Sequence, residues 1–135
     1  MKTIILPVLA TVFAPLVLAR INEIPDISSQ ALKQAVARRQ ATLLDISGPA
    51  DFKAGHIPGA IDFVREKDNL EAYLPADPNR LIVVYCHHEA CPDYTTAAAA
   101  AVDLGHTHVE FYQPGLTGWM KAGGLVEKGE GPEPR

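Results

Sequence analysis

The sequence predicts an α/β domain of the three-layer kind, with a central parallel sheet and helices on both faces. Apolar runs typical of buried strands, such as 81–86, alternate with segments of helical composition, such as 95–104. The links between these segments are short, which favours parallel strands joined by helices. The 135 residues suffice for a single core, and no internal repeat or domain boundary interrupts them.

The first elements carry clear start and stop signals. A short edge strand is expected over 21–25, where Pro25 ends it because proline lacks an amide hydrogen. A helix is expected over 31–39, because its apolar positions recur with helical spacing and Ser28 or Ser29 is placed to cap it.

The middle of the chain alternates strands, turns and short helices. A buried strand over 41–46 precedes a helix over 49–54, which begins with a proline at a favoured position. Two glycines and a proline make 55–60 a compact turn. A short strand over 60–63 and a short helix over 69–74 follow.

The second half contains the longest elements. The central strand over 81–86 leads to an alanine-rich helix over 95–104, which Gly105 ends. An alternating strand over 109–112 precedes a helix over 116–122, which a glycine pair closes. The tail from about Glu127 is rich in glycine, proline and charge, and we expect it to be frayed.

Residues 1–19 differ in kind from the rest. Lys2 is followed by an apolar stretch, and small residues up to Ala19 fit the requirements of a signal peptidase. We therefore expect residues 1–19 to be a signal peptide, residues 20–135 to be the mature domain, and the protein to be exported to the periplasm or secreted. An uncleaved anchor is the alternative, although about 16 apolar residues are short for a membrane span.

Composition excludes some partners. The net charge is −4 at pH 7, and the only basic pair is Arg38–Arg39, so no basic surface for nucleic acid is expected. Once the signal peptide is removed, no membrane partner is expected either.

Cys86 is the candidate nucleophile. It lies where the central strand ends and the chain turns toward a helix, the edge at which open α/β sheets bind ligands. Free amide groups and the helix dipole favour a negative charge there, and a thiolate is such a charge. A buried, inert cysteine remains the alternative.

Three groups of residues together resemble single-domain rhodanese-like proteins. The first signature is carried by Leu43–Asp45, Phe52 and Gly55–Ala60, the active-site strand by Val83–Cys86, and the closing segment by Leu104–Gly105, Val109, Gly115–Trp119 and Ala122–Gly123. The resemblance spans about Ile24 to Val126, which is nearly all of the expected mature chain.

The resemblance implies sulfur transfer. The Cys86 thiolate would attack the sulfane sulfur of a small anion such as thiosulfate or polysulfide, become a persulfide, and pass the outer sulfur to a thiol or cyanide. It implies no metal and no organic cofactor. The loop that would hold the substrate comprises His87, His88, Glu89, Ala90, Cys91, Pro92 and Asp93.

The chain departs from the family pattern in places. Ser47 stands where many members carry an arginine that braces the strand aspartate, and Pro114–Gly115 replaces a glycine pair. The stretch from Cys86 to Leu104 is about two residues longer than in common members. This longer loop, with a second cysteine at Cys91, resembles an exported subgroup of rhodaneses.

The longer loop also raises the phosphatase-like and arsenate reductase relatives. Those enzymes grip oxyanions with an arginine near the end of the loop. No arginine or lysine lies between Cys86 and Lys121, so these activities are not expected.

Several residues have two interpretations. His87 or His88 would assist the thiolate when protonated, or lie in the loop as exposed side chains. Cys91 is either a resolving thiol that forms a disulfide with Cys86 or a packing residue. Asp93 is an alternative helix cap rather than a catalytic group.

Three further predictions concern structure and metals. His56 is expected to brace its turn, and Asp45 is expected to be structural. Two cysteines and two histidines suit zinc or copper in type, with His106 or His108 as a further candidate ligand, but adjacent histidines rarely point the same way, so no metal site is expected.

Two other functions stay open. The missing arginine brace and the absence of basic loop residues fit a non-catalytic sulfur-binding or interaction module. The pair Cys86 and Cys91 fits a dithiol redox protein.

Overall fold

The computed structural model describes residues 23–88, 91 and 94–135. The predicted signal peptide at 1–19 lies outside the described residues, as do Glu89, Ala90, Pro92 and Asp93 of the predicted substrate loop. Among the helices of the described part, none has the length and apolar character needed to cross a membrane.

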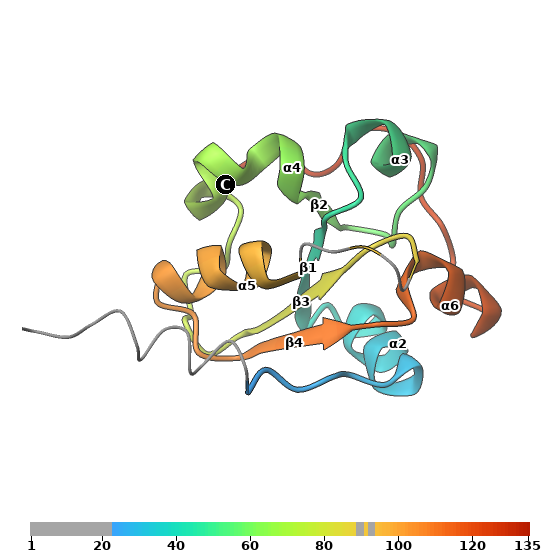
Figure 1. Ribbon diagram of the computed structural model, residues 1–135, viewed down its shortest axis with the longest axis horizontal. Coiled ribbons are helices and arrows are strands. Elements are labelled where there is room, and N and C mark those ends of the chain that lie inside the picture. Colours follow the sequence, from blue (N-terminus) through green and yellow to red (C-terminus); the bar gives the residue numbers. More distant parts are fainter. Residues whose placement is uncertain (1–22, 89–90, 92–93) are drawn as a thin grey trace, which may run out of the picture.

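The described residues form a sheet of four parallel strands in the order β2-β1-β3-β4 (Figure 1). Their bounds are Ala41–Asp45 for β1, Ile61–Asp62 for β2, Leu81–Tyr85 for β3 and Val109–Tyr112 for β4. Because all four are parallel, their carboxyl ends share one edge of the sheet. The register aligns Asp62, Asp45, Tyr85 and Tyr112 along that edge, with β3 in an interior position.

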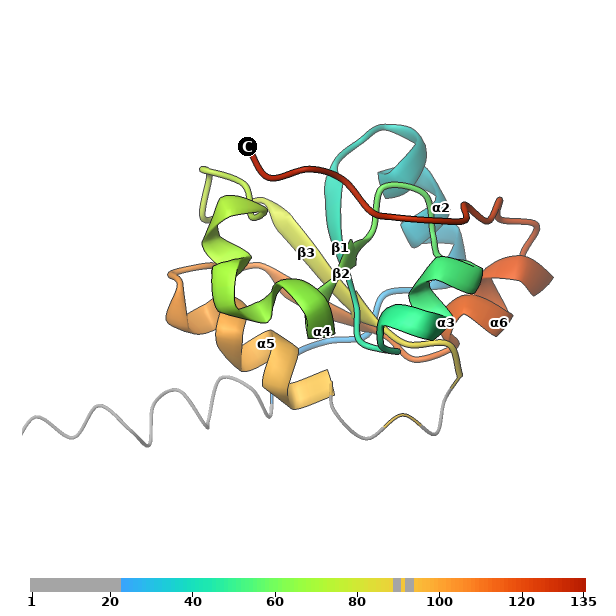
Figure 2. The same ribbon diagram turned by 90° about the horizontal axis from the view of Figure 1, so that it is seen from above.

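Helices cover both faces of the sheet, which confirms the predicted architecture (Figures 1 and 2). The helical elements are α2 (Ser29–Ala37), α3 (Pro49–Ala54), α4 (Phe63–Glu66), the 3₁₀ helix η1 (Lys67–Ala72), α5 (Tyr94–Asp103) and α6 (Gly115–Lys121). Helices α4, η1 and α5 pack against Leu44 and Val84 on one face. Helices α2, α3 and α6 pack against Leu43 and Val83 on the other. Neighbouring residues of one strand therefore contribute to two separate cores.

Local signals account for the ends of several elements. The Ser28 hydroxyl accepts a hydrogen bond from the Ala31 amide at 3.1 Å, and so caps α2 as predicted. Gly105 follows α5 with φ of +94°, a conformation that glycine adopts at little cost.

The structure differs from the sequence prediction at three elements. In place of the edge strand expected over 21–25, the described residues have a single parallel bridge between Asp26 and Phe111. This contact begins after Pro25, where the strand was expected to end. Strand β2 stops at Asp62 because that side chain accepts a hydrogen bond from the Arg65 amide and starts α4, which was not predicted. The helix expected over 69–74 is instead a 3₁₀ helix that begins and ends two residues earlier.

The tail from Glu127 onward is bound to the domain, although its composition predicts that it is frayed (Figure 2). Glu127 and His56 exchange two backbone hydrogen bonds of 2.9 Å. Further along, the Gly129 amide donates to the Lys53 carbonyl and the Arg135 amide to the Ala72 carbonyl, each at 2.9 Å. These backbone bonds need no particular side chain, so composition does not reveal them.

Substitutions of two valines should separate the core from the surface. Val84 is fully buried in β3, so Val84→Ala should lower the free energy of unfolding by about 2 kcal/mol through lost burial and a residual cavity. Val64, which is 41% exposed on α4, is the matched control, and Val64→Ala should change it by less than about 0.5 kcal/mol. Urea unfolding measures both, and equal losses would contradict this placement of the core.

Candidate active site

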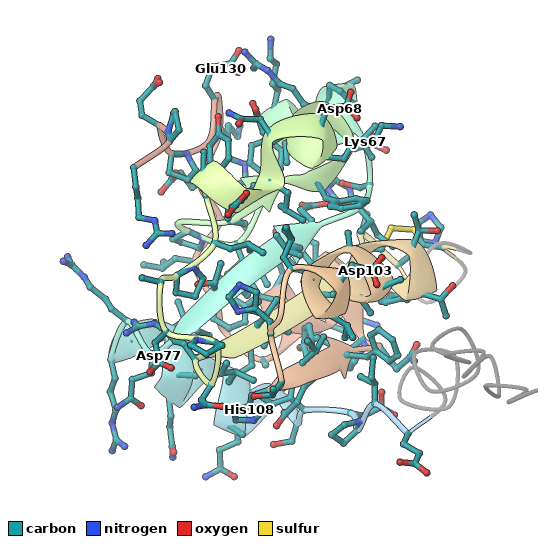
Figure 3. All side chains as sticks on the ribbon, turned by 90° about the vertical axis from the view of Figure 1, so that its left-hand side faces the viewer. Lys67, Asp68, Asp77, Asp103, His108 and Glu130 are labelled. Atoms are coloured by element: carbon teal, nitrogen blue, oxygen red, sulfur yellow. A yellow bond between two sulfur atoms is a disulfide. The ribbon has the colours of Figure 1, made fainter. Side chains whose placement is uncertain are left out.

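Cys86 lies at the end of β3 and is fully buried. Its sulfur is bonded to that of Cys91, with the two Cα atoms 6.2 Å apart (Figure 3). Cys91 is only partly buried and packs against the core on the α5 side. Helix α5 then begins at Tyr94, so both cysteines lie between the carboxyl end of an interior strand and the start of the longest helix described.

The start of α6 fixes the backbone of Cys86 and His87. The Leu116 amide donates to the Cys86 carbonyl at 2.8 Å, and the Thr117 amide donates to the His87 carbonyl at 3.1 Å. The Thr117 hydroxyl donates to the same carbonyl at 3.0 Å. These contacts leave the first two loop carbonyls satisfied by hydrogen bonds.

Gly115 makes this close approach feasible. Its φ is +64°, and a Cβ atom there would lie 2.5 Å from the Cys86 carbonyl oxygen. Since the steric demand falls on this one position, Pro114 is tolerated where the family pattern has a second glycine. Sequence reasoning placed both Gly115 and Thr117 in the closing segment, but it predicted neither of these contacts with the cysteine loop.

Two histidines brace the turn beside the loop. His56 is fully buried and stacks on Phe52 with ring centroids 3.8 Å apart. Its Nδ1 donates to the Phe52 carbonyl at 2.7 Å, and its Nε2 lies 3.3 Å from a Glu127 carboxylate oxygen. These contacts support the structural role predicted for His56. The His87 ring is also engaged, because its Nε2 donates to the Gly55 carbonyl at 3.0 Å.

A buried tyrosine connects the strand to the same turn. The Tyr85 hydroxyl accepts a hydrogen bond from the Ile57 amide at 3.0 Å. Burial, together with the negative charge of Asp45, raises the pKa of Tyr85 well above its usual value, so the hydroxyl stays protonated. The partner lies 28 positions away along the chain, and no local pattern indicates it.

Ser47 takes over the bracing of Asp45. One Asp45 carboxylate oxygen accepts from the Ser47 amide at 2.9 Å and from the Ser47 hydroxyl. The fully buried strand aspartate is therefore held by a residue two positions away, although the arginine of the family pattern is absent. This contact supports the structural role predicted for Asp45.

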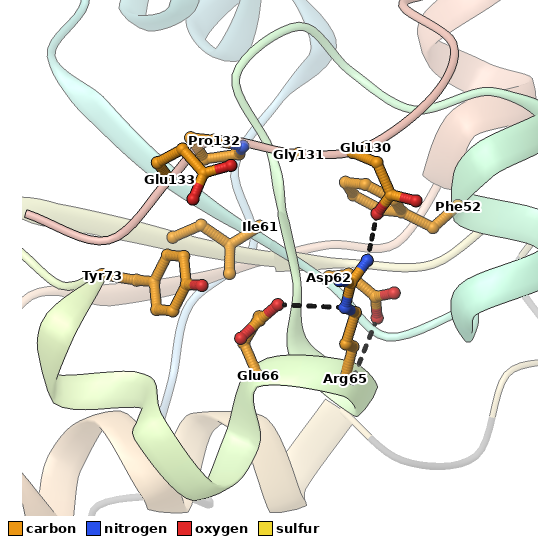
Figure 4. Close-up of a pocket in the computed structure, with 10 residues that line it drawn as sticks. All are labelled: Phe52, Ile61, Asp62, Arg65, Glu66, Tyr73, Glu130, Gly131, Pro132 and Glu133. Carbon is orange, nitrogen blue, oxygen red and sulfur yellow. Dashed lines mark hydrogen bonds and ion pairs between the residues drawn. The ribbon is translucent and has the colours of Figure 1, made fainter.

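A small acidic cavity lies at the outer edge of the sheet, beside β2 (Figure 4). Asp62, Arg65, Glu66, Tyr73 and Glu130 contribute to its lining, and Cys86 does not. Burial is the main cause that raises the pKa of Asp62, and the charge of Asp45 in the neighbouring strand adds to it. The cavity therefore belongs to the anchoring of the tail and not to the cysteine loop.

Comparison with known proteins defines the class to which this chain belongs. The rhodanese-like domain matches residues 28–122, so this chain belongs to the family of rhodanese-like domains. It is also 35% identical over 100 residues to an HTH-type transcriptional regulator of Mycobacterium tuberculosis, covering 71% of this chain and 43% of the regulator. The chain thus spans less than half the length of that curated relative.

Solved structures show the same fold. The 3-mercaptopyruvate sulfotransferase SseA of Escherichia coli superposes with a TM-score of 0.62 at 18% identity, covering 82% of this chain and 53% of that one. Thiosulfate sulfurtransferase of Pseudomonas aeruginosa gives 0.59 at 22% identity, covering 86% and 22%. The predicted rhodanese-like fold is therefore confirmed.

Two glycine substitutions test the contact between α6 and the cysteine loop. Gly59 has φ of +82° with open space around it, so Gly59→Ala should cost about 1–2 kcal/mol from backbone strain alone. Gly115→Ala adds a clash with the Cys86 carbonyl and should lower the free energy of unfolding by about 3 kcal/mol or more. Chemical denaturation compares the pair, and equal costs would show that the clash is relieved cheaply.

Asp62 gives a test of pH dependence. Because its pKa is raised by folding, the folded state binds this proton more tightly than the unfolded chain, and stability falls as pH rises through the raised pKa. Asp62→Asn keeps an oxygen for the Arg65 amide but does not ionise. The variant should gain stability relative to wild type on going from acidic to neutral pH, measured by urea unfolding at both. A difference that does not change with pH would contradict the shift.

Proposed function

We propose that this protein is a sulfurtransferase in which Cys86 carries sulfane sulfur as a persulfide. The donor is a small sulfur-containing anion such as thiosulfate or polysulfide, and the acceptor is a thiol. The observation that carries the proposal is the position of Cys86, at the end of the interior strand β3 in a rhodanese-like domain. Two sulfurtransferases share this fold, which supports the proposal further.

The chemistry needs a thiolate and a place for negative charge. The Cys86 thiolate attacks the sulfane sulfur of thiosulfate, the sulfur–sulfur bond of the donor breaks, and sulfite leaves with the electron pair. An acceptor thiolate then attacks the outer sulfur of the persulfide, and the Cys86 thiolate is released. Helix α5 starts at Tyr94, three positions after Cys91, so the positive end of its dipole lies at the loop end of the helix, where it favours these anions.

The loop holds its anion without an arginine or lysine from the sequence around it. Neither residue type lies between Cys86 and Lys121, so the groups that this stretch offers to the negative charge are backbone amides, the helix dipole, and His87 or His88. This arrangement favours a sulfur anion over a phosphoryl or arsenate group, which enzymes grip with arginine.

The disulfide means that transfer requires a reductant. With Cys86 bonded to Cys91, no thiolate is available. Two electrons and two protons from external thiols are needed to open the bond. We further propose that residues 1–19 are a signal peptide that directs export to the periplasm. The thiols that reduce the disulfide would then have to be supplied in that compartment.

The same disulfide favours a second candidate, a dithiol redox protein that exchanges electrons through Cys86 and Cys91 without handling sulfane sulfur. The two candidates differ in what they require of Cys91. A disulfide relay depends on it, whereas simple sulfur transfer to an added acceptor does not.

Sulfur transfer from thiosulfate to cyanide tests the proposal on protein that has been reduced and desalted. Wild type should form thiocyanate, and Cys86→Ser should lower the rate by at least about a thousandfold, because the sulfur carrier is lost. Cys91→Ser is the matched control for removal of a thiol and should retain transfer.

Loss of transfer in Cys91→Ser as complete as in Cys86→Ser would favour the redox candidate. No transfer by wild type or by Cys91→Ser, with no mass gain of one sulfur atom on Cys86 of Cys91→Ser after polysulfide treatment, would contradict the sulfurtransferase and leave a non-catalytic sulfur-binding or interaction module.

A further inference from the structure

Cys91 has no task in sulfur transfer to an external acceptor, yet its sulfur is bonded to the nucleophile. We propose that Cys91 is an internal acceptor that attacks the Cys86 persulfide, releases hydrosulfide and forms the disulfide. The domain would then act as a thiol-driven reductase of sulfane sulfur, an activity that rests on the proposed formation of a Cys86 persulfide.

The backbone places the two sulfurs within reach while the elements around them stay in place. The Cys86 carbonyl is held by the Leu116 amide at 2.8 Å, and Tyr94, buried at the start of α5, fixes the other end of the loop. Across this fixed gap the Cα atoms of Cys86 and Cys91 lie 6.2 Å apart, within the usual range for a bridged pair. Attack by Cys91 is therefore intramolecular and needs no diffusing partner.

Burial assigns different tasks to the two sulfurs. Cys86 is fully buried, whereas Cys91 is partly exposed. An external thiolate must approach the sulfur that it attacks, so it opens the disulfide at Cys91 and forms a mixed disulfide there. Cys86 is the leaving thiolate, and the dipole of α5 favours its negative charge.

The bond can be broken and remade without unfolding the domain. The cysteines are five positions apart, so the bridge constrains the unfolded chain little. The large buried side chains of both cores, such as Leu44 and Phe52, come from the strands and helices outside this loop. The disulfide is therefore suited to a reaction cycle and not to holding the fold together.

The cycle balances in three steps. The Cys86 thiolate takes sulfur from thiosulfate and releases sulfite. The Cys91 thiol attacks the inner sulfur of the persulfide, the outer sulfur leaves with the electron pair, and the Cys91 proton is carried away as hydrosulfide. Two external thiols then reduce the disulfide and become a disulfide themselves, so one sulfane sulfur is reduced for every two thiols oxidised.

The experiment is a single turnover on the full chain without free thiol. Protein is reduced, desalted under argon, and mixed with one equivalent of thiosulfate or of an alkyl thiosulfonate anion, neither of which yields sulfide on giving up its sulfane sulfur. Released hydrosulfide is measured, and the intact mass of the protein is recorded after acid quenching. Cys91→Ser and Cys91→Ala are compared with wild type, with Cys86→Ser as the blank and circular dichroism as the check of folding.

Wild type should release one hydrosulfide per chain and lose the mass of two hydrogen atoms, as a disulfide forms. Both Cys91 variants should instead gain the mass of one sulfur atom and release at least about tenfold less hydrosulfide, because the intramolecular acceptor is gone. A small monothiol added to oxidised wild type and quenched with acid should be found on Cys91.

Persistence of the sulfur atom on wild type, as stable as on the variants, would overturn the internal acceptor and leave the sulfurtransferase intact. If neither donor loads sulfur onto Cys86 in the Cys91 variants, both proposals are overturned. The internal acceptor would also be overturned if the disulfide forms in wild type without release of hydrosulfide. The same conclusion follows if the disulfide forms to the same extent when no donor is added, because both results show direct oxidation of the two cysteines.

Discussion

The hydrogen bond from the Leu116 amide to the Cys86 carbonyl is the contact on which the site depends. It joins the end of β3 to the start of α6, two segments that the chain connects only through α5 and β4. The bond requires Gly115 at a positive φ, since any larger residue there would meet the Cys86 carbonyl. Through it, a helix on one face of the sheet positions a thiol that packs on the other.

The alternation of side chains along β3 separates two kinds of chemistry. Tyr85 faces the core under α2, α3 and α6, and its pKa is raised mainly by burial, with a further contribution from the charge of Asp45 in the neighbouring strand. Cys86, one position later, belongs to the core under α5. Asp45 and Asp62 lie along the same sheet edge as Cys86, but the sheet separates their carboxylates from the sulfur. Their negative charges therefore destabilise a Cys86 thiolate less than they would if all three side chains lay on one face.

Much of the fold follows from local sequence. Ser28 and Gly105 mark helix ends through hydrogen bonds or backbone angles within a few residues, and the apolar run of β3 needs burial on both faces whatever surrounds it. The same locality placed Cys86 at a strand end. The contacts that sequence reasoning missed, from Tyr85 to Ile57 and from Thr117 to His87, join residues 28 and 30 positions apart. Such pairs are set by the three-dimensional arrangement and leave no periodic trace in the chain.

The C-terminal strap, residues 127–135, is connected through a chain of hydrogen bonds to the segment that carries Cys86. Glu127 is paired with His56, the preceding Gly55 carbonyl binds the His87 ring, and His87 is the neighbour of Cys86. A force or partner that lifts the strap would act first on the turn at Gly55–His56 and then on His87, next to Cys86. The segment whose composition predicts fraying is therefore connected through one turn to the residue that follows Cys86, and loss of its backbone hydrogen bonds would remove part of the support of that turn.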